Sequence, residues 1–359
     1  MNKYFLSEIV SIETGKLDSN AATEIGEYPF FTCDPNPLKI DHFAYDTKAI
    51  LMAGNNANAK FHLNYFEGKF NAYQRTYIFQ ILDGDNFCLK FLYYYLRSHR
   101  KVLSNLGSGT STKYLTKKVL DNFEIFIPNK KTQEQITNIL SKLDQKIELN
   151  EKMNEKLEEI TKTLFKSWFI DFDPIRAKAE GEPTGLSKEI SDLFPDSFED
   201  SELGDIPKGW KSGNLGDLFE PSRGKIITKA KTNPGIVPVV AGGIKPPYYH
   251  SESNVKGPVI TISASGTAGY VNLYYQDIWA SDCSYVNKDT FKKIFFAHSF
   301  LKINQERIYD LRHGAVQQHV YPKDLVELPI VISTDSIINT YEDIASQLHK
   351  KIETNLIES

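Results

Sequence analysis

The chain has 359 residues, enough for two domains with separate cores, and its 41% hydrophobic and 25% charged residues are typical of a soluble globular protein. Three scattered cysteines (Cys33, Cys88 and Cys283) argue against a disulfide framework or a zinc site and predict a reducing cytoplasm. No signal-peptide core or membrane-spanning apolar run is present. The net charge of -4 argues against a uniformly basic nucleic-acid-binding protein.

Residues 1–130 alternate short apolar runs with turn signals, which predicts a β-rich module. Apolar residues at helical spacing over 91–103 predict one helix within it. Glycine, serine and threonine over 107–112 predict a flexible polar loop. We expect strands over 50–53 and 75–82 and a closing strand over 120–128.

A long helix is predicted over residues 131–170. Thr132 and Gln135 have the spacing of a capping box, and one apolar stripe continues from Ile136 to Leu164. A helix of roughly 38 residues would be ~57 Å long, more than the ~34 Å of one turn of B-DNA. Because its stripe is narrow, this helix needs a partner helix, and Asn150 and Asn154 on the stripe could fix the register of that pair.

The polar, acidic residues 171–202 are rich in proline and glycine and predict a linker. Residues 203–333 repeat the β-rich plan, with strands expected over 257–265, 271–275 and 324–332 and helix over 291–310. A second, shorter helix is expected within 334–359. By region, residues 1–130 carry a net charge of +2, 131–202 of -7, 203–333 of +4 and 334–359 of -3. The two globular parts are therefore mildly basic, which favours local phosphate contact.

The chain is duplicated. Residues 91–150 align with 296–355 at one constant shift, which places Gly109 on Gly314. Further upstream the shift changes slightly. There the sequence matches Leu6 with Leu215, Gly15 with Gly224, Phe70 with Trp279, and Gln74 and Arg75 with Asp282 and Cys283. The repeat predicts two similar modules, each a globular part followed by a helix, and duplex DNA is a partner with two comparable halves.

Several stretches resemble the specificity subunit of type I restriction-modification systems. The run from Leu203 through Ile206 and Pro207 to Trp210 resembles the opening of that family's target recognition domain. The segments around Gln133 and Trp168 resemble its central conserved helix and the residues that follow it. The resemblance covers nearly the whole chain, and the duplication is typical of the family.

The resemblance implies an α+β fold with two pseudo-repeated target recognition domains, separated by long conserved helices that form an antiparallel coiled coil. The domains would be residues 1–130 and 203–333, which would dock in the major groove, and the helices would act as a molecular ruler for a bipartite target. The subunit would have no catalysis of its own. It would bind two methyltransferase subunits, which use S-adenosylmethionine to methylate adenine, and translocase–nuclease subunits, which use ATP and Mg²⁺.

The sequence departs from the family's pattern in two places. The first module lacks the opening that precedes Trp210 in the second module. The second helix is shorter than the first, so we expect an incomplete antiparallel pair and unequal docking surfaces for the methyltransferase subunits.

Candidate DNA contacts lie in polar loops at matching places in the two modules. Arginine and lysine can pair with guanine, asparagine and glutamine with adenine, and short polar side chains allow the backbone to approach phosphate. The alternative is that these loops are ordinary turns. In the first module the candidates are Asn56, Asn58, Lys60, Arg75, Ser108, Thr110, Thr112 and Lys113; in the second they are Arg223, Lys225, Ser263, Ser265, Thr267, Gln317, Gln318 and His319.

Other activities are poorly supported. Lys245 precedes two prolines and a tyrosine, but an adenine methyltransferase needs a side-chain acceptor at that position. Glu67 and Lys69 match only the tail of a nuclease metal site, and the chain has no phosphate-binding loop for ATP. Two alternatives to a DNA reader stay open: a two-lobed coiled-coil adaptor that never touches DNA, and a half-active or regulatory specificity subunit.

Overall fold

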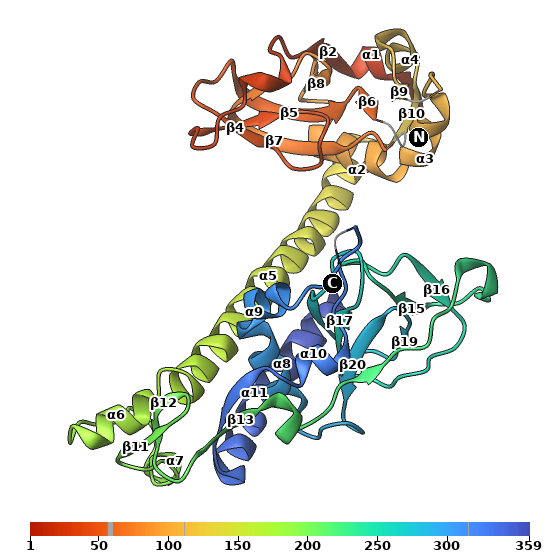
Figure 1. Ribbon diagram of the computed structural model, residues 1–359. Helices are drawn as coiled ribbons and strands as arrows, with labels where there is room; N and C mark the ends of the chain where they lie inside the picture. The colour runs from red at the N-terminus through yellow and green to blue at the C-terminus, as the bar shows by residue number, and fades with distance from the viewer. Residues whose placement is uncertain (57–59, 111, 315) are drawn as a thin grey trace. The chain divides into compact units, whose positions relative to one another are not determined.

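The computed structural model describes residues 1–56, 60–110, 112–314 and 316–359. The chain forms two compact units, an N-terminal unit (Met1–Lys146) and a C-terminal unit (Ile147–Ser359). Helix α5 (Lys130–Phe169) runs through the boundary (Figure 1). The mixture of β-rich units and long helices confirms the expected α+β class.

A six-stranded sheet forms the centre of the N-terminal unit. Its strand order is β2-β8-β5-β7-β3-β4, and all neighbours are antiparallel except β3 and β7. Ile50 and Phe79 face a core that includes Leu92, while Leu51 and Phe70 face a second, smaller core. Both faces of the central strands are therefore buried. The bounds are β2 (Val10–Thr14), β3 (Tyr28–Phe31), β4 (Leu38–Ile40), β5 (Tyr45–Ala53), β7 (Leu63–Ala72) and β8 (Thr76–Ile81), with η1 at Ser19–Ala21.

The helix expected over 91–103 is two helices, α2 (Leu89–Ser98) and α3 (Arg100–Leu106). His99 interrupts them, with its ring stacked 4.1 Å from that of Tyr95. The closing strand expected over 120–128 is a short helix, α4 (Lys117–Asp121), followed by β10 (Glu124–Ile127), which pairs with β1 (Asn2–Phe5) next to α1 (Leu6–Ile9).

The start of α5 differs from the expected capping box. Asn129 caps the helix, since its side chain accepts from the N–H of Thr132 at 3.0 Å. Gln133 is buried and bonds instead to the neighbouring loop, accepting from the N–H of Cys88 at 2.9 Å. The first turn of α5 is thereby held to the residue before α2.

The C-terminal unit contains the same strand connections divided among smaller sheets. One sheet has the order β14-β20-β17-β18 and another β16-β15-β19, with β15 and β19 parallel. In the N-terminal unit, one strand, β7, pairs with both β5 and β3. In the C-terminal unit, two strands replace it: β18 pairs with β17, and β19 pairs with β15. Helices α8 and α9 follow β20 as α2 and α3 follow β8. The bounds are β14 (Ser222–Arg223), β15 (Val237–Val240), β16 (Tyr248–His250), β17 (Val259–Ser263), β18 (Val271–Tyr274), β19 (Trp279–Ala280), β20 (Cys283–Asn287), α8 (Ile294–Ile303) and α9 (Gln305–Asp310), with η2 at Leu215–Asp217 and η3 at Lys229–Lys231.

The strand expected over 324–332 is again a short helix and a strand, α10 (Pro322–Leu325) and β21 (Pro329–Ile332), and β21 pairs with β13 (Lys211–Asn214). Leu6 and Leu215 make equivalent backbone bonds, to the carbonyls of Phe123 and Leu328 at 2.9 and 2.8 Å. This confirms the sequence match between them.

The partner helix for α5 is α11 (Asp335–Glu358). Buried Tyr341 donates to the carbonyl of Thr161 at 3.1 Å, while Asn355 donates to the side chain of Asn154 at 2.8 Å. Asn150 donates to the carbonyl of Asn355 at 3.2 Å. Because residue numbers rise along α5 as they fall along α11, the helices are antiparallel, and both polar positions on the stripe lie at the contact.

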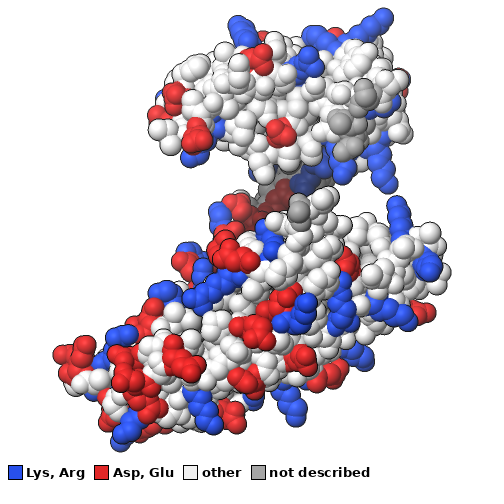
Figure 2. Space-filling view, in the orientation of Figure 1, with Lys and Arg blue, Asp and Glu red and all other residues white. Residues whose placement is uncertain are grey.

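Residues 171–202, expected to be a linker, pack against the core of the C-terminal unit. Phe172, Ile175 and Phe194 are buried in one cluster with Trp168 and Trp210. The acidic side chains of this segment gather on the surface over α6, α7 and β11 (Figure 2, lower left). A few apolar residues therefore fold a segment whose composition is mostly polar. The bounds are α6 (Asp173–Ala179), α7 (Lys188–Ser191), β11 (Phe198–Ser201) and β12 (Gly204–Pro207).

Candidate nucleic-acid interface

The first component of the candidate interface is a tight loop in the N-terminal unit. Ser108 and Tyr114 exchange two backbone hydrogen bonds, of 3.0 and 2.9 Å, across it. Gly109 has φ of 110°, and a Cβ there would meet the carbonyl of Thr112 at under 3.0 Å. Only glycine fits this position without strain.

The C-terminal unit contains the same loop. His313 and His319 exchange backbone bonds of 3.0 and 2.9 Å, and Gly314 has φ of 109°. A Cβ on Gly314 would meet the carbonyl of Gln317 at under 3.0 Å. The constant shift found in the sequence therefore corresponds to equivalent backbone geometry here.

Backbone bonds join each loop to two further segments. In the N-terminal unit, Gly54 donates to the carbonyl of Arg75 at 2.8 Å and accepts from Leu115 at 2.9 Å. In the C-terminal unit, Ala264 donates to the carbonyl of Asp282 at 3.2 Å and accepts from Val320 at 3.1 Å. We call this assembly the three-segment cluster. It consists of the loop after a strand (at Gly54 or Ala264), the turn at Arg75 or Asp282, and the tight loop closed by Ser108 and Tyr114 or by His313 and His319.

The bonds also correct two sequence matches. Gly15 and Gly224 are equivalent as expected, and their N–H groups donate to Thr76 and Cys283 at 3.2 and 2.9 Å. Thr76, not Arg75, is therefore the counterpart of Cys283, and Arg75 is the counterpart of Asp282.

Before the turn, β3 pairs Phe31 with Ala72, as β15 pairs Val240 with Ala280. The match of Phe70 with Trp279 is thus also wrong by one residue. Three residues separate Ala72 from Thr76, but two separate Ala280 from Cys283. Gly15 and Gly224 differ by 209 positions, but Ala72 and Ala280 differ by 208, so the N-terminal unit has one extra residue between Gly15 and Ala72 that the sequence match missed, and a second one in this turn.

In the N-terminal unit, the candidates Lys60, Arg75, Ser108, Thr110 and Thr112 are exposed, and Asn56 and Lys113 are partly buried. Strand β6 (Asn55–Asn56) pairs with β9 (Lys113–Tyr114), so Asn56 lies opposite Lys113. Asn58 lies outside the described residues.

A pocket of about 350 Å³ opens within the cluster of the N-terminal unit. Arg75 and Thr112 line it, together with Asn55, Gln74 and Tyr114, which were not among the candidates. The structure thus brings together two candidates that are 37 positions apart in the sequence, Arg75 and Thr112, around one depression.

In the C-terminal unit, Arg223 donates from Nη2 to Oδ1 of Asp282 at 2.7 Å, and the hydroxyl of Ser265 donates to Oδ2 of the same carboxylate. The Arg223 guanidinium lies 5.4 Å from the centre of the Tyr321 ring, and the His319 ring stacks on that ring at 5.7 Å. Asp282 and Tyr321 were not among the candidates from the sequence. The sequence match had paired Arg75 with Cys283, so Asp282 was not recognised as the counterpart of Arg75.

The other candidates of this unit differ in access. Gln317, Gln318 and Lys225 are exposed, while the hydroxyl of Thr267 donates to the carbonyl of Gly242 at 2.9 Å. Ser263 is only 4% exposed, so its side chain is not available to a partner in this conformation.

The thiols near the two clusters carry no charge at neutral pH. Burial raises the pKa of Cys283 to about 12 and also raises the pKa of Cys33, which bonds to the side chain of Asn55 at 2.7 Å. The charged groups of the clusters are therefore their arginines, lysines and Asp282.

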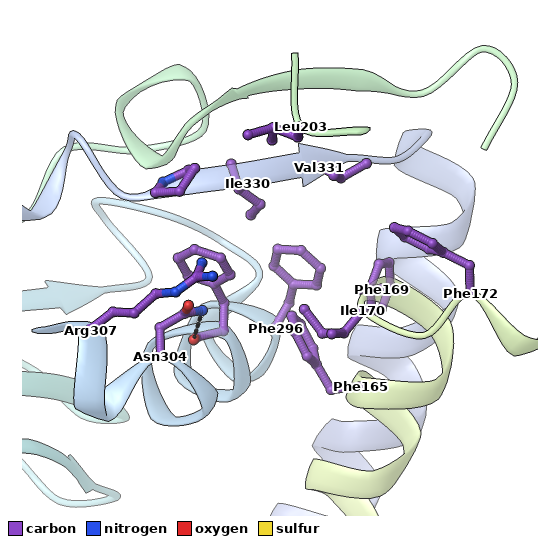
Figure 3. Close-up of a pocket in the computed structure, with 12 residues that line it drawn as sticks. Phe165, Phe169, Ile170, Phe172, Leu203, Phe296, Asn304, Arg307, Ile330 and Val331 are labelled. Carbon is purple, nitrogen blue, oxygen red and sulfur yellow. Dashed lines mark hydrogen bonds between the residues drawn. The ribbon is translucent and has the colours of Figure 1, made fainter. Parts of the chain in front are cut away.

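A separate pocket of about 290 Å³ lies in the C-terminal unit. The rings of Phe165 and Phe169 lie on one side of it, and Asn304 and Arg307 lie on the other (Figure 3). It is lined mainly by core side chains. No group of three or more His, Cys, Asp or Glu in the part of the chain that the structure describes could hold a metal ion. Nor does any helix of that part have the length and apolar character needed to cross a membrane.

Comparison with known proteins gives a consistent result. The family model for the type I restriction modification DNA specificity domain matches residues 1–159 and 207–358. The chain is 33% identical over 214 residues to the type I restriction enzyme EcoDI specificity subunit of Escherichia coli, covering 57% of this chain and 46% of that protein. It is 41% identical over 93 residues to the HindI specificity subunit of Haemophilus influenzae, covering 26% and 20%. The matched segments thus span less than half the length of these relatives.

The fold is similar to a solved structure, that of a type I restriction-modification system S subunit from M. genitalium. The TM-score is 0.63 at 18% identity, and the match covers 99% of this chain and 91% of that one. The family model matches most of both units, and this match shows that the chain belongs to the type I restriction modification DNA specificity family.

Proposed function

We propose that the chain recognises a bipartite sequence in duplex DNA, with the three-segment cluster of each unit contacting one half-site. The observation that supports this most strongly is that one backbone arrangement is built twice, with different polar side chains on it. Two equivalent supports with different side chains suit a partner whose two halves have the same backbone but different bases.

The chemistry of the clusters fits this role. Arg75, Arg223 and Lys225 provide donors for phosphate or guanine, while Gln317 and Gln318 are exposed amides of the kind that pair with adenine. The residues from Ser108 to Thr112 include short polar side chains beside a glycine, so a phosphate could approach the backbone closely. Neutralised phosphates would make the binding salt-dependent.

Partner enzymes would perform the reactions. We propose that the chain directs two methyltransferase subunits, which use S-adenosylmethionine, and restriction subunits, which use ATP and Mg²⁺, to the DNA in the cytoplasm. The outcome would be adenine methylation of the host's sites and cleavage of foreign DNA. The antiparallel contact of α5 with α11 gives a helical surface on which such subunits could assemble.

A binding assay tests the proposal. The full chain in the complex isolated from its native host is titrated with duplex fragments of the host genome over a range of salt concentrations. We expect the logarithm of the binding constant to fall linearly with the logarithm of salt concentration. Methylated adenines mapped in the genome should form a two-part motif with a fixed gap.

Other results would favour the alternatives. Absence of salt-dependent binding would favour an adaptor that does not contact DNA. Binding to only one half-site, or two copies of the chain in the isolated complex, would favour a half-active or regulatory subunit. The mass of the complex distinguishes one copy from two.

A further inference from the structure

We infer that Asp282 positions the guanidinium of Arg223 to read a guanine in the half-site of the C-terminal unit. The inference rests on the proposed function and adds to it one base, one reading side chain and one positioning side chain. It concerns the turn before β20 and the end of β14, which lie side by side because Arg223 pairs with Ser284.

The Asp282 carboxylate is held in one orientation. Oδ1 accepts from Arg223 at 2.7 Å, and Oδ2 accepts from the hydroxyl of Ser265 on the post-strand loop. Its backbone carbonyl accepts from Ala264 at 3.2 Å. Because both carboxylate oxygens and the main chain are bonded, the Arg223 guanidinium is paired with a fixed group.

The ring of Tyr321 restricts the guanidinium further. It lies 5.4 Å from Arg223 and is itself stacked with His319. A guanidinium has five N–H donors, and bidentate pairing with O6 and N7 of guanine uses two of them. The Arg223 side chain is 35% exposed, so part of it remains accessible to DNA while its Nη2 is bonded to Asp282.

The ion pair itself has little value for stability. Pairs that are this exposed contribute little to stability, so folding alone does not explain the arrangement. An arginine that is paired with a carboxylate also attracts phosphate less strongly than an arginine without such a partner. What the pair does provide is a defined orientation, which base reading requires and phosphate contact does not.

The N-terminal unit supports the assignment by contrast. Thr14 pairs with Tyr77 as Arg223 pairs with Ser284, so Thr14 is the counterpart of Arg223, and Arg75 is the counterpart of Asp282. Each cluster thus has one arginine at this place, but Arg223 lies in β14 whereas Arg75 lies in the turn before β8. In the C-terminal unit the arginine is paired with the Asp282 carboxylate, whereas Arg75 lines an open pocket.

The test measures base discrimination by the complex isolated from its native host. The probes are duplexes containing the methylated motif, with each base pair of both half-sites changed in turn, and with 7-deazaguanine replacing each guanine. Binding is measured for the wild type and for Arg223→Lys, Asp282→Asn, Asp282→Glu and Ser265→Ala. Arg307→Lys, an exposed arginine of the same unit, and Arg75→Lys, in the other unit, are the matched controls.

We expect Arg223→Lys and Asp282→Asn to reduce discrimination at the same single guanine by about 5- to 150-fold, the range of one bidentate contact. The 7-deazaguanine probe should weaken wild-type binding at that guanine but have little further effect on Arg223→Lys. Ser265→Ala should have a smaller effect there, and Asp282→Glu should restore part of the loss. Arg307→Lys should change nothing, and Arg75→Lys should affect only the other half-site.

Three results would overturn the inference. The variants could weaken binding to all sequences equally, which indicates a phosphate contact. They could leave discrimination unchanged although unfolding curves show a folded protein, or alter it at a base other than guanine. If the wild-type complex itself does not discriminate among sequences, the proposed function fails, which the wild-type measurements alone reveal.

Discussion

Replacing Gly314 with alanine tests whether the tight loop of the C-terminal unit supports recognition. Its φ of 109° lies in a region that L-residues rarely adopt, and such positions cost about 1–3 kcal/mol for other residues. The new Cβ would also come within 3.0 Å of the carbonyl of Gln317, so the loop must open. Opening disturbs the two bonds between His313 and His319.

The expected result has two parts. A loss of about 1–3 kcal/mol in a unit of this size lowers Tm by about 2–12 °C. Discrimination at the half-site of the C-terminal unit should weaken, while that at the other half-site is retained. Gly109→Ala should give the reverse pattern, since Gly109 has the same geometry in the N-terminal unit.

Two further glycines serve as controls. Gly204 has φ of 89° with open space around it, so Gly204→Ala introduces backbone strain without a collision. Gly84 has neither constraint, so Gly84→Ala should be neutral or stabilise the fold slightly. Calorimetry and half-site binding are measured for all four variants. If Gly314→Ala behaves like Gly84→Ala in both assays, the loop geometry is not important for recognition and the reasoning is refuted.

Two other predictions concern the contact of α11 with its neighbours. Tyr341→Phe should lower the free energy of unfolding by about 1–3 kcal/mol, because it removes the buried hydroxyl that bonds to Ser299 and Thr161; an unchanged denaturation midpoint would contradict this. Burial lowers the pKa of His349 to about 4, so its contribution to stability is complete above pH 6.5 and is lost as pH falls towards 4, by about 3 kcal/mol. His349→Gln should flatten the dependence of Tm on pH within this window, and an identical slope in wild type and variant would count against the assignment.

The sequence predicted the features that depend on periodicity. The apolar stripe of α5 required a partner helix, and Asn150 and Asn154 lie at that contact as expected. Gly109 and Gly314 matched because each occupies a conformation that only glycine tolerates well. Helix periodicity determines the spacing of apolar residues, and a strongly positive φ favours glycine, so both features can be predicted from sequence.

Other features depend on single residues and were not predicted. One additional residue between Gly15 and Ala72 was missed in the sequence match, which displaced the later pairs by one position and concealed the relation of Arg75 to Asp282. The linker prediction for 171–202 rested on mean composition, but burial there is decided by Phe172 and Phe194. Ser263 lies in the strand expected over 257–265, and its burial follows from the pairing of β17 with β18 and β20, which the local sequence does not reveal.

The main-chain bonding of the tight loops has a consequence for how such a protein can evolve. Ser108 and Tyr114 in one loop correspond to His313 and His319 in the other, yet the bonds across both loops have the same lengths. Since amide groups rather than side chains fix this shape, selection can exchange the side chains without rebuilding the scaffold. The two loops of this chain already carry different side chains on equivalent backbones. New sequence preferences could therefore arise by point substitution or by recombination between the repeats.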